Sequence, residues 1–147
     1  MSGEHVIQAL EEQVGCYRRL AKLAAIQHEH VVREQTESLI EVLKSRQEVL
    51  ERIGTLERLV GPAKKSWNAF VDPMSGEKRA KAEELLGETK RLLEEITISD
   101  QNDVLVLQQR KLNLGRQINQ ASAARQVNRT YAAAAYGPAR AKMDVQR

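Results

Sequence analysis

Two histidines are the only side chains in the sequence whose grouping suggests a metal site. His28 and His30 flank Glu29. On a helix two positions are separated by about 200°, so the imidazoles point to opposite sides and cannot share an ion. Helices that bind zinc place their histidines four positions apart instead. We therefore interpret the cluster as one histidine on a packed face beside one on the surface, and we expect no metal site.

The single cysteine, Cys16, is the one candidate thiol nucleophile. Arg18 and Arg19 follow closely and could lower the pKa of the thiol. However, no histidine lies three or four positions away to act as its base. The sequence also has no GxxxxGK[ST] phosphate loop and no strand-associated GxGxxG. We therefore expect no enzyme activity and no cofactor.

The composition favours packed helices. Hydrophobic residues make up 41% of the 147 residues but aromatic residues only 3%, so the core must be built from aliphatic side chains. Eight glycines and three prolines leave few tight turns. No apolar run of about 18 residues and no secretory signal pattern is present. One cysteine cannot form an internal disulfide, which agrees with a reducing compartment. We expect an all-α protein in the cytoplasm, with no membrane insertion.

Apolar spacing predicts one long N-terminal helix over residues 4–60. Apolar residues recur there at alternating steps of three and four, with one slip of register near Val32. The helix should end at Gly61-Pro62, because glycine accepts a left-handed cap and proline cannot continue the hydrogen-bond ladder. The connector that follows contains Trp67 and Phe70, which we interpret as a lid over the end of the bundle, with a partner-binding loop as the alternative.

Two shorter helices are predicted over residues 77–96 and 99–128, with Ser99 as a cap between them. Together with the long helix they form an antiparallel helical hairpin or three-helix bundle, which is one domain over residues 1–128. Residues 129–147 are expected to form a flexible basic tail, since Pro138 rules out a continuous helix there.

Charge is concentrated toward the end of the chain. Residues 110–147 contain eight basic side chains and one acidic side chain, whereas residues 71–109 contain five basic and nine acidic ones. We interpret the basic end as a complement to the acidic middle segment in a folded-back bundle. Nucleic-acid binding is the alternative, but the basic residues are dispersed and few aromatic side chains are present to stack on bases. We therefore expect no nucleic-acid partner.

The third predicted helix and the tail have more apolar surface than the other helices can cover. Leu105 and Leu112 widen the predicted apolar stripe of this helix. For the aliphatic members of the candidate set the alternative is ordinary bundle core, and for the tyrosines it is packing back on the bundle. The candidate partner-binding residues are Leu105, Leu112, Leu114, Ile118, Val127, Tyr131 and Tyr136.

Several motifs follow one another in a recognisable order. The first helix has a tyrosine followed by a leucine, and then two runs of leucine with charged residues. A leucine segment later leads into a helix that contains an asparagine, and the end of the chain carries tyrosine and glycine. These motifs are Tyr17-Arg18-Arg19-Leu20, residues 39–44 and 49–53, Leu92-Leu93-Glu94-Glu95-Ile96 with Asn102, and Tyr131 with Tyr136-Gly137-Pro138.

This layout, which covers nearly the whole chain, resembles that of the FlgN-like flagellar export chaperones. The resemblance implies a small cytoplasmic chaperone of the flagellar type III export system. Such a protein holds hook–filament junction (hook-associated) proteins unassembled and delivers them to the export gate. It also implies that the tail engages the client or the gate, and we expect a monomer or weak homodimer.

A structural coiled-coil or adaptor protein that dimerises through its long helix is the alternative function. The slip of register near Val32 counts against a long regular coiled coil.

Overall fold

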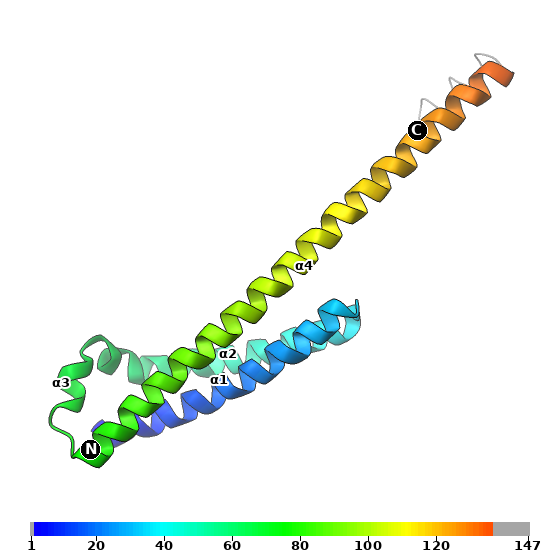
Figure 1. Ribbon diagram of the computed structural model, residues 1–147. Helices are drawn as coiled ribbons and strands as arrows, with labels where there is room; N and C mark the ends of the chain where they lie inside the picture. The colour runs from blue at the N-terminus through cyan, green and yellow to red at the C-terminus, as the bar shows by residue number, and fades with distance from the viewer. Residues whose placement is uncertain (1, 137–147) are drawn as a thin grey trace. The chain divides into compact units, whose positions relative to one another are not determined.

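The computed structural model describes the backbone of residues 2–136 and the side chains of residues 3–132. Every regular element in this part of the chain is a helix, which confirms the predicted all-α class. The chain divides into two compact units, residues 1–106 and residues 107–147. The helices, shown in Figure 1, are α1 (Ser2–Val32), α2 (Thr36–Lys65), α3 (Trp67–Val71) and α4 (Gly76–Tyr136).

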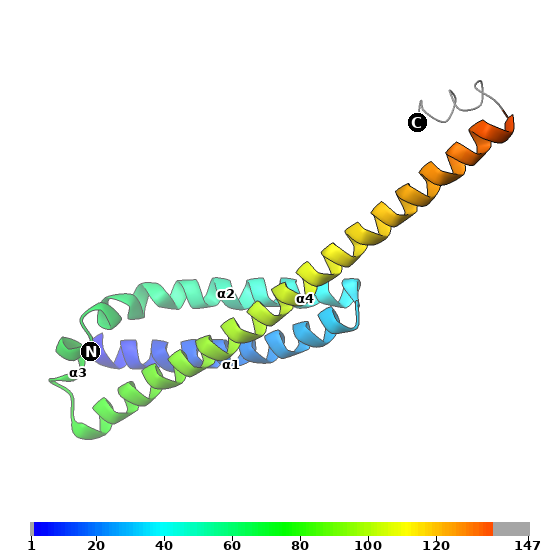
Figure 2. The ribbon, with the colours of Figure 1, turned by 45° about the horizontal axis from the view of Figure 1, so that its top comes forward.

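The predicted continuous helix over residues 4–60 is wrong, because a tight turn divides it. Glu34 has a left-handed backbone, with φ of 57°. The N–H of Gln35 donates to the carbonyl of His30 at 2.9 Å, and the N–H of Glu34 donates to that of Val31 at 3.3 Å. These two bonds close the end of α1 in the manner of a Schellman cap. The slip of register near Val32 therefore marks a reversal of the chain, and α1 and α2 lie side by side as an antiparallel hairpin (Figure 2).

The predicted helix end at Gly61-Pro62 is also wrong, since α2 continues to Lys65. Proline removes one hydrogen bond from the ladder, but here it lies in the last turn, where other contacts hold the chain. Val60 is fully buried. Lys64 donates to Glu57 at 3.0 Å and to Gln13 of α1 at 3.2 Å. These contacts fix the end of α2 against α1.

The predicted helices over residues 77–96 and 99–128 form one helix, α4, so the break expected around Ser99 is wrong. Compared with alanine, each residue at this point disfavours the helix by only a few tenths of a kcal/mol, and the packing of buried neighbours such as Ile96 offsets this cost. The helix also continues past 128 to Tyr136, because the alanines at 132–135 are strong helix formers. The expected flexibility of the remaining tail, residues 137–147, concerns a segment outside the described residues.

The core of residues 1–106 is made by three helices and the short α3. Tyr17 and Leu20 of α1 meet Val49 and Ile53 of α2 and Ile96 of α4. Toward the other end of the hairpin the clusters continue through aliphatic residues of the same helices, with Trp67 and Phe70 packed against them as the lid interpretation predicts. The rings of Trp67 and Phe70 lie 5.4 Å apart, centre to centre. Residues 1–106 are therefore a helical bundle closed at one end by α3.

Across the described part of the chain, no helix combines the length and the apolar character that a membrane span requires.

Candidate functional site

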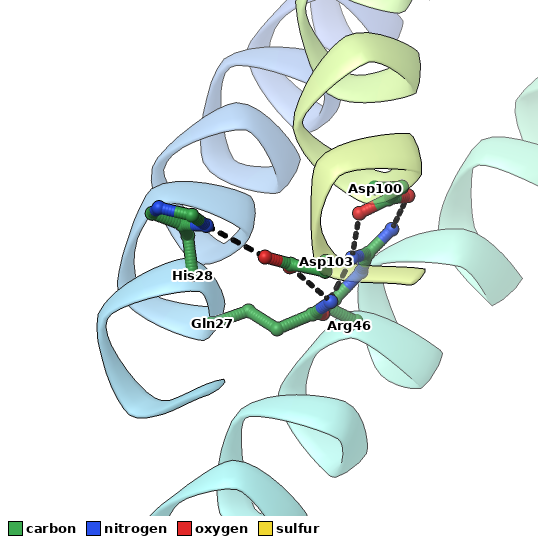
Figure 3. A network of polar contacts seen from close by, with 5 residues as sticks. All are labelled: Gln27, His28, Arg46, Asp100 and Asp103. Carbon is green, nitrogen blue, oxygen red and sulfur yellow. Dashed lines mark hydrogen bonds and ion pairs between the residues drawn. The ribbon is translucent and has the colours of Figure 1, made fainter. Parts of the chain in front are cut away.

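A buried polar cluster fastens α4 to the hairpin within residues 1–106 (Figure 3). At its centre is the Asp103 carboxylate, which is 2% exposed. One of its oxygens accepts a hydrogen bond from Gln27 Nε2 at 2.9 Å, and the other lies 2.7 Å from His28 Nδ1. Because the carboxylate is an acceptor, the proton of this second bond belongs to the imidazole. The two α1 side chains thus satisfy a carboxylate that would otherwise be costly to bury.

The same cluster ties α4 to α2 through an arginine. Arg46 donates two parallel hydrogen bonds to Asp100, at 2.7 and 2.8 Å, and a third to the side-chain oxygen of Gln27. The hydrogen bonds to Asp100 raise the pKa of the Arg46 guanidinium above its ordinary value. Among the described residues, no buried side-chain nitrogen or oxygen lacks a hydrogen-bond partner. The cluster is therefore internally saturated and serves to hold the three helices together.

The two histidines have different partners. His28 faces Asp103 of α4, whereas His30 Nδ1 lies 2.8 Å from the side-chain oxygen of Gln35 in the turn. This agrees with the interpretation of one histidine on a packed face and one at the surface. In the part of the chain that the structure describes, no three His, Cys, Asp or Glu side chains gather as metal ligands would.

The surroundings of Cys16 disfavour the ionised thiol. Burial raises the pKa of the thiol, and the nearby carboxylate of Glu12 raises it further. These effects exceed the opposing charges of Arg52 and Arg19. Arg19 does lower the pKa of the thiol, as the sequence suggested, but the packing of Cys16 against the core outweighs this effect.

The sequence-predicted partner-binding residues all lie on α4, and those with described side chains are exposed. Leu105 belongs to the first unit and the others to the second. Tyr136 is the last residue of α4, and its side chain lies outside the described ones. The exposed fractions are 62% for Leu105, 59% for Leu112, 58% for Leu114, 55% for Ile118, 53% for Val127 and 73% for Tyr131.

Within residues 107–132 none of the side chains is buried. Leu107, Leu114 and Ile118 are separated by steps of seven and four, so they return to one side of the helix. Leu112 lies five positions from Leu107, about 140° around the axis, and so belongs to another side. This part of α4 thus has an apolar ridge, which we define as Leu107, Leu114 and Ile118, and a second apolar side that includes Leu112.

A shallow hollow lies on the side of the helix that carries Leu112, where Gly115 contributes no side chain. Its volume is about 520 Å³, and two basic side chains, Lys111 and Arg116, line it together with Leu112. Gln108 and Asn119 complete the lining. No other atom lies within 4 Å of the position that a Cβ of Gly115 would take. The hollow is therefore open, partly apolar, and bordered by positive charge.

The polar cluster was not predicted, although the sequence holds a signal for it. Asp100 and Asp103 continue the three- and four-residue steps that begin at Thr89, Leu92 and Ile96, so they lie on the packed stripe once α4 is continuous. Acidic residues on a packed stripe require partners. The identity of those partners depends on the hairpin of α1 and α2, which the predicted continuous helix over residues 4–60 does not contain.

No protein-family model, curated protein or solved structure matches this chain.

Proposed function

We propose that the chain is a cytoplasmic chaperone of the flagellar type III export system. In this proposal it binds an amphipathic terminal helix of a hook–filament junction protein, prevents premature assembly of that protein and delivers it to the export apparatus. The observation that carries the proposal is the exposure of large apolar residues along residues 107–131 of α4. The motif order that resembles the FlgN-like chaperones supplies the identity of the client.

An amphipathic helix fits this surface better than a globular partner does. Leu107, Leu114 and Ile118 recur at helical spacing, which is how one helix presents anchors to another. Each is between 45% and 58% exposed, so packing against a client helix would remove apolar surface from water. Exposed polar and basic residues surround the ridge, so the contact would have a charged rim. Such an interface favours reversible binding, which a chaperone needs because it must release its client.

The alternative function, an adaptor that dimerises through its long N-terminal helix, has less support. Residues 4–60 form an antiparallel hairpin and not one helix, and their apolar side chains pack within the hairpin and against α4. The stripe that such a dimer would use is therefore already covered.

Co-purification with tagged hook–filament junction proteins tests the proposal. We expect the chain to capture at least one of them, and the double variant Leu114→Asp with Ile118→Asp to lose that capture. The reason is that two carboxylates on the ridge would have to be desolvated by the client helix. Failure to bind any junction protein would contradict the proposal.

The matched control is Leu93→Asp with Ile98→Asp. These residues are of the same types, lie on the same helix and are 41% and 51% exposed, but they belong to residues 1–106. The control should keep full capture. If it lost capture while the ridge variant kept it, the client surface would lie on the bundle instead.

A further inference from the structure

Every charged residue in the exposed segment of α4 is basic. Between residues 107 and 136 the sequence has five basic residues and no acidic residue. The preceding part of the helix, residues 76–106, has five basic and eight acidic residues. A helix that serves only as solvated surface usually alternates charges of both signs, as residues 76–106 do. The change of composition therefore coincides with the change from buried to exposed apolar side chains.

Four of these basic side chains differ from those of the bundle in their ion pairing. Lys111, Arg116, Arg125 and Arg129 make no ion pair with any residue that the structure describes. By contrast, basic residues of the bundle such as Arg18, Arg52 and Lys78 each pair with a glutamate of another helix. Lys111, Arg125 and Arg129 lie close to the ridge around the helix axis, whereas Arg116 lies on the far side of the hollow.

Two other occupants fit this surface less well, for different reasons. A second copy of this segment would bring five basic residues against five with no carboxylate between them, and like charges across an interface are unfavourable. A nucleic acid would leave the apolar ridge uncovered. Stacking on bases also needs aromatic side chains, of which residues 107–132 contain only Tyr131.

We propose that the partner of residues 107–136 is an amphipathic helix flanked by aspartate and glutamate residues. Its apolar side chains pack on the ridge, and a carboxylate enters the hollow over Gly115, between Lys111 and Arg116. This inference rests on the proposed function and deepens it, since it specifies the chemistry of the client segment. Charge complementarity would then select the correct client and orient it as it docks.

Three synthetic amphipathic peptides with identical apolar faces test the inference, with glutamate, glutamine or lysine at the flanking positions. Binding to the full chain is measured by fluorescence anisotropy at low and high salt. We expect the glutamate peptide to bind at least about tenfold more tightly than the lysine peptide, because opposite charges replace like charges across the interface. This preference should shrink as added salt screens the charges.

The double variant Lys111→Glu with Arg116→Glu should abolish or reverse the preference. The matched control is Lys90→Glu with Arg91→Glu, which makes the same charge change at two exposed positions of residues 76–106. It should keep the preference for the glutamate peptide.

Any other result overturns the inference, and each such result points to a different explanation. Equal binding of all three peptides, or an unchanged preference in the Lys111/Arg116 variant, refutes the acidic partner but leaves helix binding intact. Binding of no peptide refutes this inference, whereas the proposed function is decided separately by the capture of junction proteins. Tighter binding of duplex DNA than of the glutamate peptide, with a steep loss in salt, identifies a nucleic-acid surface instead. A stable dimer by sedimentation that blocks peptide binding identifies a second copy.

Discussion

Leu10 and Leu114 are the same residue type on helices of the same chain, but Leu10 is completely buried and Leu114 is 58% exposed. In residues 1–106 leucines of this kind meet partners from another helix, and ion pairs such as Glu12–Arg52 join the helices at their edges. In residues 107–136 leucines recur at helical spacing without such partners, and the acidic residues are absent. Amphipathic spacing alone therefore does not tell whether a helical face packs within its own chain or binds a different molecule.

The two regions should differ most in how much stability they lose when a leucine is truncated. Leu10→Ala should lower the free energy of unfolding by about 3 kcal/mol, because it leaves a cavity where Leu56 and Val60 pack. Leu114→Ala should change it by less than about 0.5 kcal/mol, since an exposed side chain has little packing to lose. Urea unfolding followed by circular dichroism measures both. Equal losses would mean that Leu114 is packed within the chain.

The buried polar cluster gives the second largest expected effect. Asp103→Ala should lower the free energy of unfolding by about 2 kcal/mol, because the amide of Gln27 would remain buried without its acceptor. Asp72→Ala is the control: the carboxylate of Asp72 lies 3.7 Å from Arg79 at an exposed site, so its loss should cost less than about 0.5 kcal/mol. Chemical denaturation compares the two variants. An unchanged free energy of unfolding in Asp103→Ala would show that the cluster does not hold α4.

The turn that closes the hairpin predicts a stabilising change. Glu34→Gly should raise the free energy of unfolding by about 1 kcal/mol, because glycine adopts a φ of 57° without the steric cost that a side chain adds. Glu37→Gly, at the second residue of α2, should lower the free energy of unfolding by a similar amount, about 1 kcal/mol, since glycine disfavours a helix. Thermal unfolding of both variants checks the opposite signs. A lower free energy of unfolding in the Glu34→Gly variant would place position 34 outside the left-handed region in solution.

The smallest expected effect concerns thiol reactivity. The pKa of Cys16 is raised, so at any pH below it a smaller share of the thiol is ionised than in an exposed cysteine. At pH 8, Cys16 should therefore react with iodoacetamide at least about threefold more slowly than a thiol placed at exposed position 122, in a variant with Cys16→Ser and Ser122→Cys. Mass spectrometry of timed samples gives the two rates. Faster reaction at Cys16 would indicate an activated thiol.

The fold could be predicted from the sequence where periodicity and local propensity agree. The all-α class follows from aliphatic residues at steps of three and four. The hairpin turn could not be located in this way, because its residues, Arg33 to Gln35, include neither glycine nor proline, and the left-handed residue is a glutamate. The continuity of α4 through Ser99 was missed for the converse reason, since tertiary contacts of Ile96 and Asp103 outweigh weak local preferences.

The candidate surface was predictable only in part. An excess of apolar residues late in the chain identified Leu112, Leu114 and Ile118, but spacing alone left bundle core as their alternative role. Their exposure becomes visible only when the hairpin and the first part of α4 have filled the core. Conversely, the partners of Asp103 come from residues 75 and 76 positions away, and no local pattern indicates such a pairing.

Hydrogen–deuterium exchange of the full chain, with and without the glutamate-flanked peptide, tests whether residues 107–131 are a surface on which a client helix docks. We expect slower exchange of backbone amides in this segment when the peptide is bound, with α1 and α2 unchanged. Protection confined to α1 and α2, or exchange in residues 107–131 that the bound peptide does not alter, would contradict this expectation.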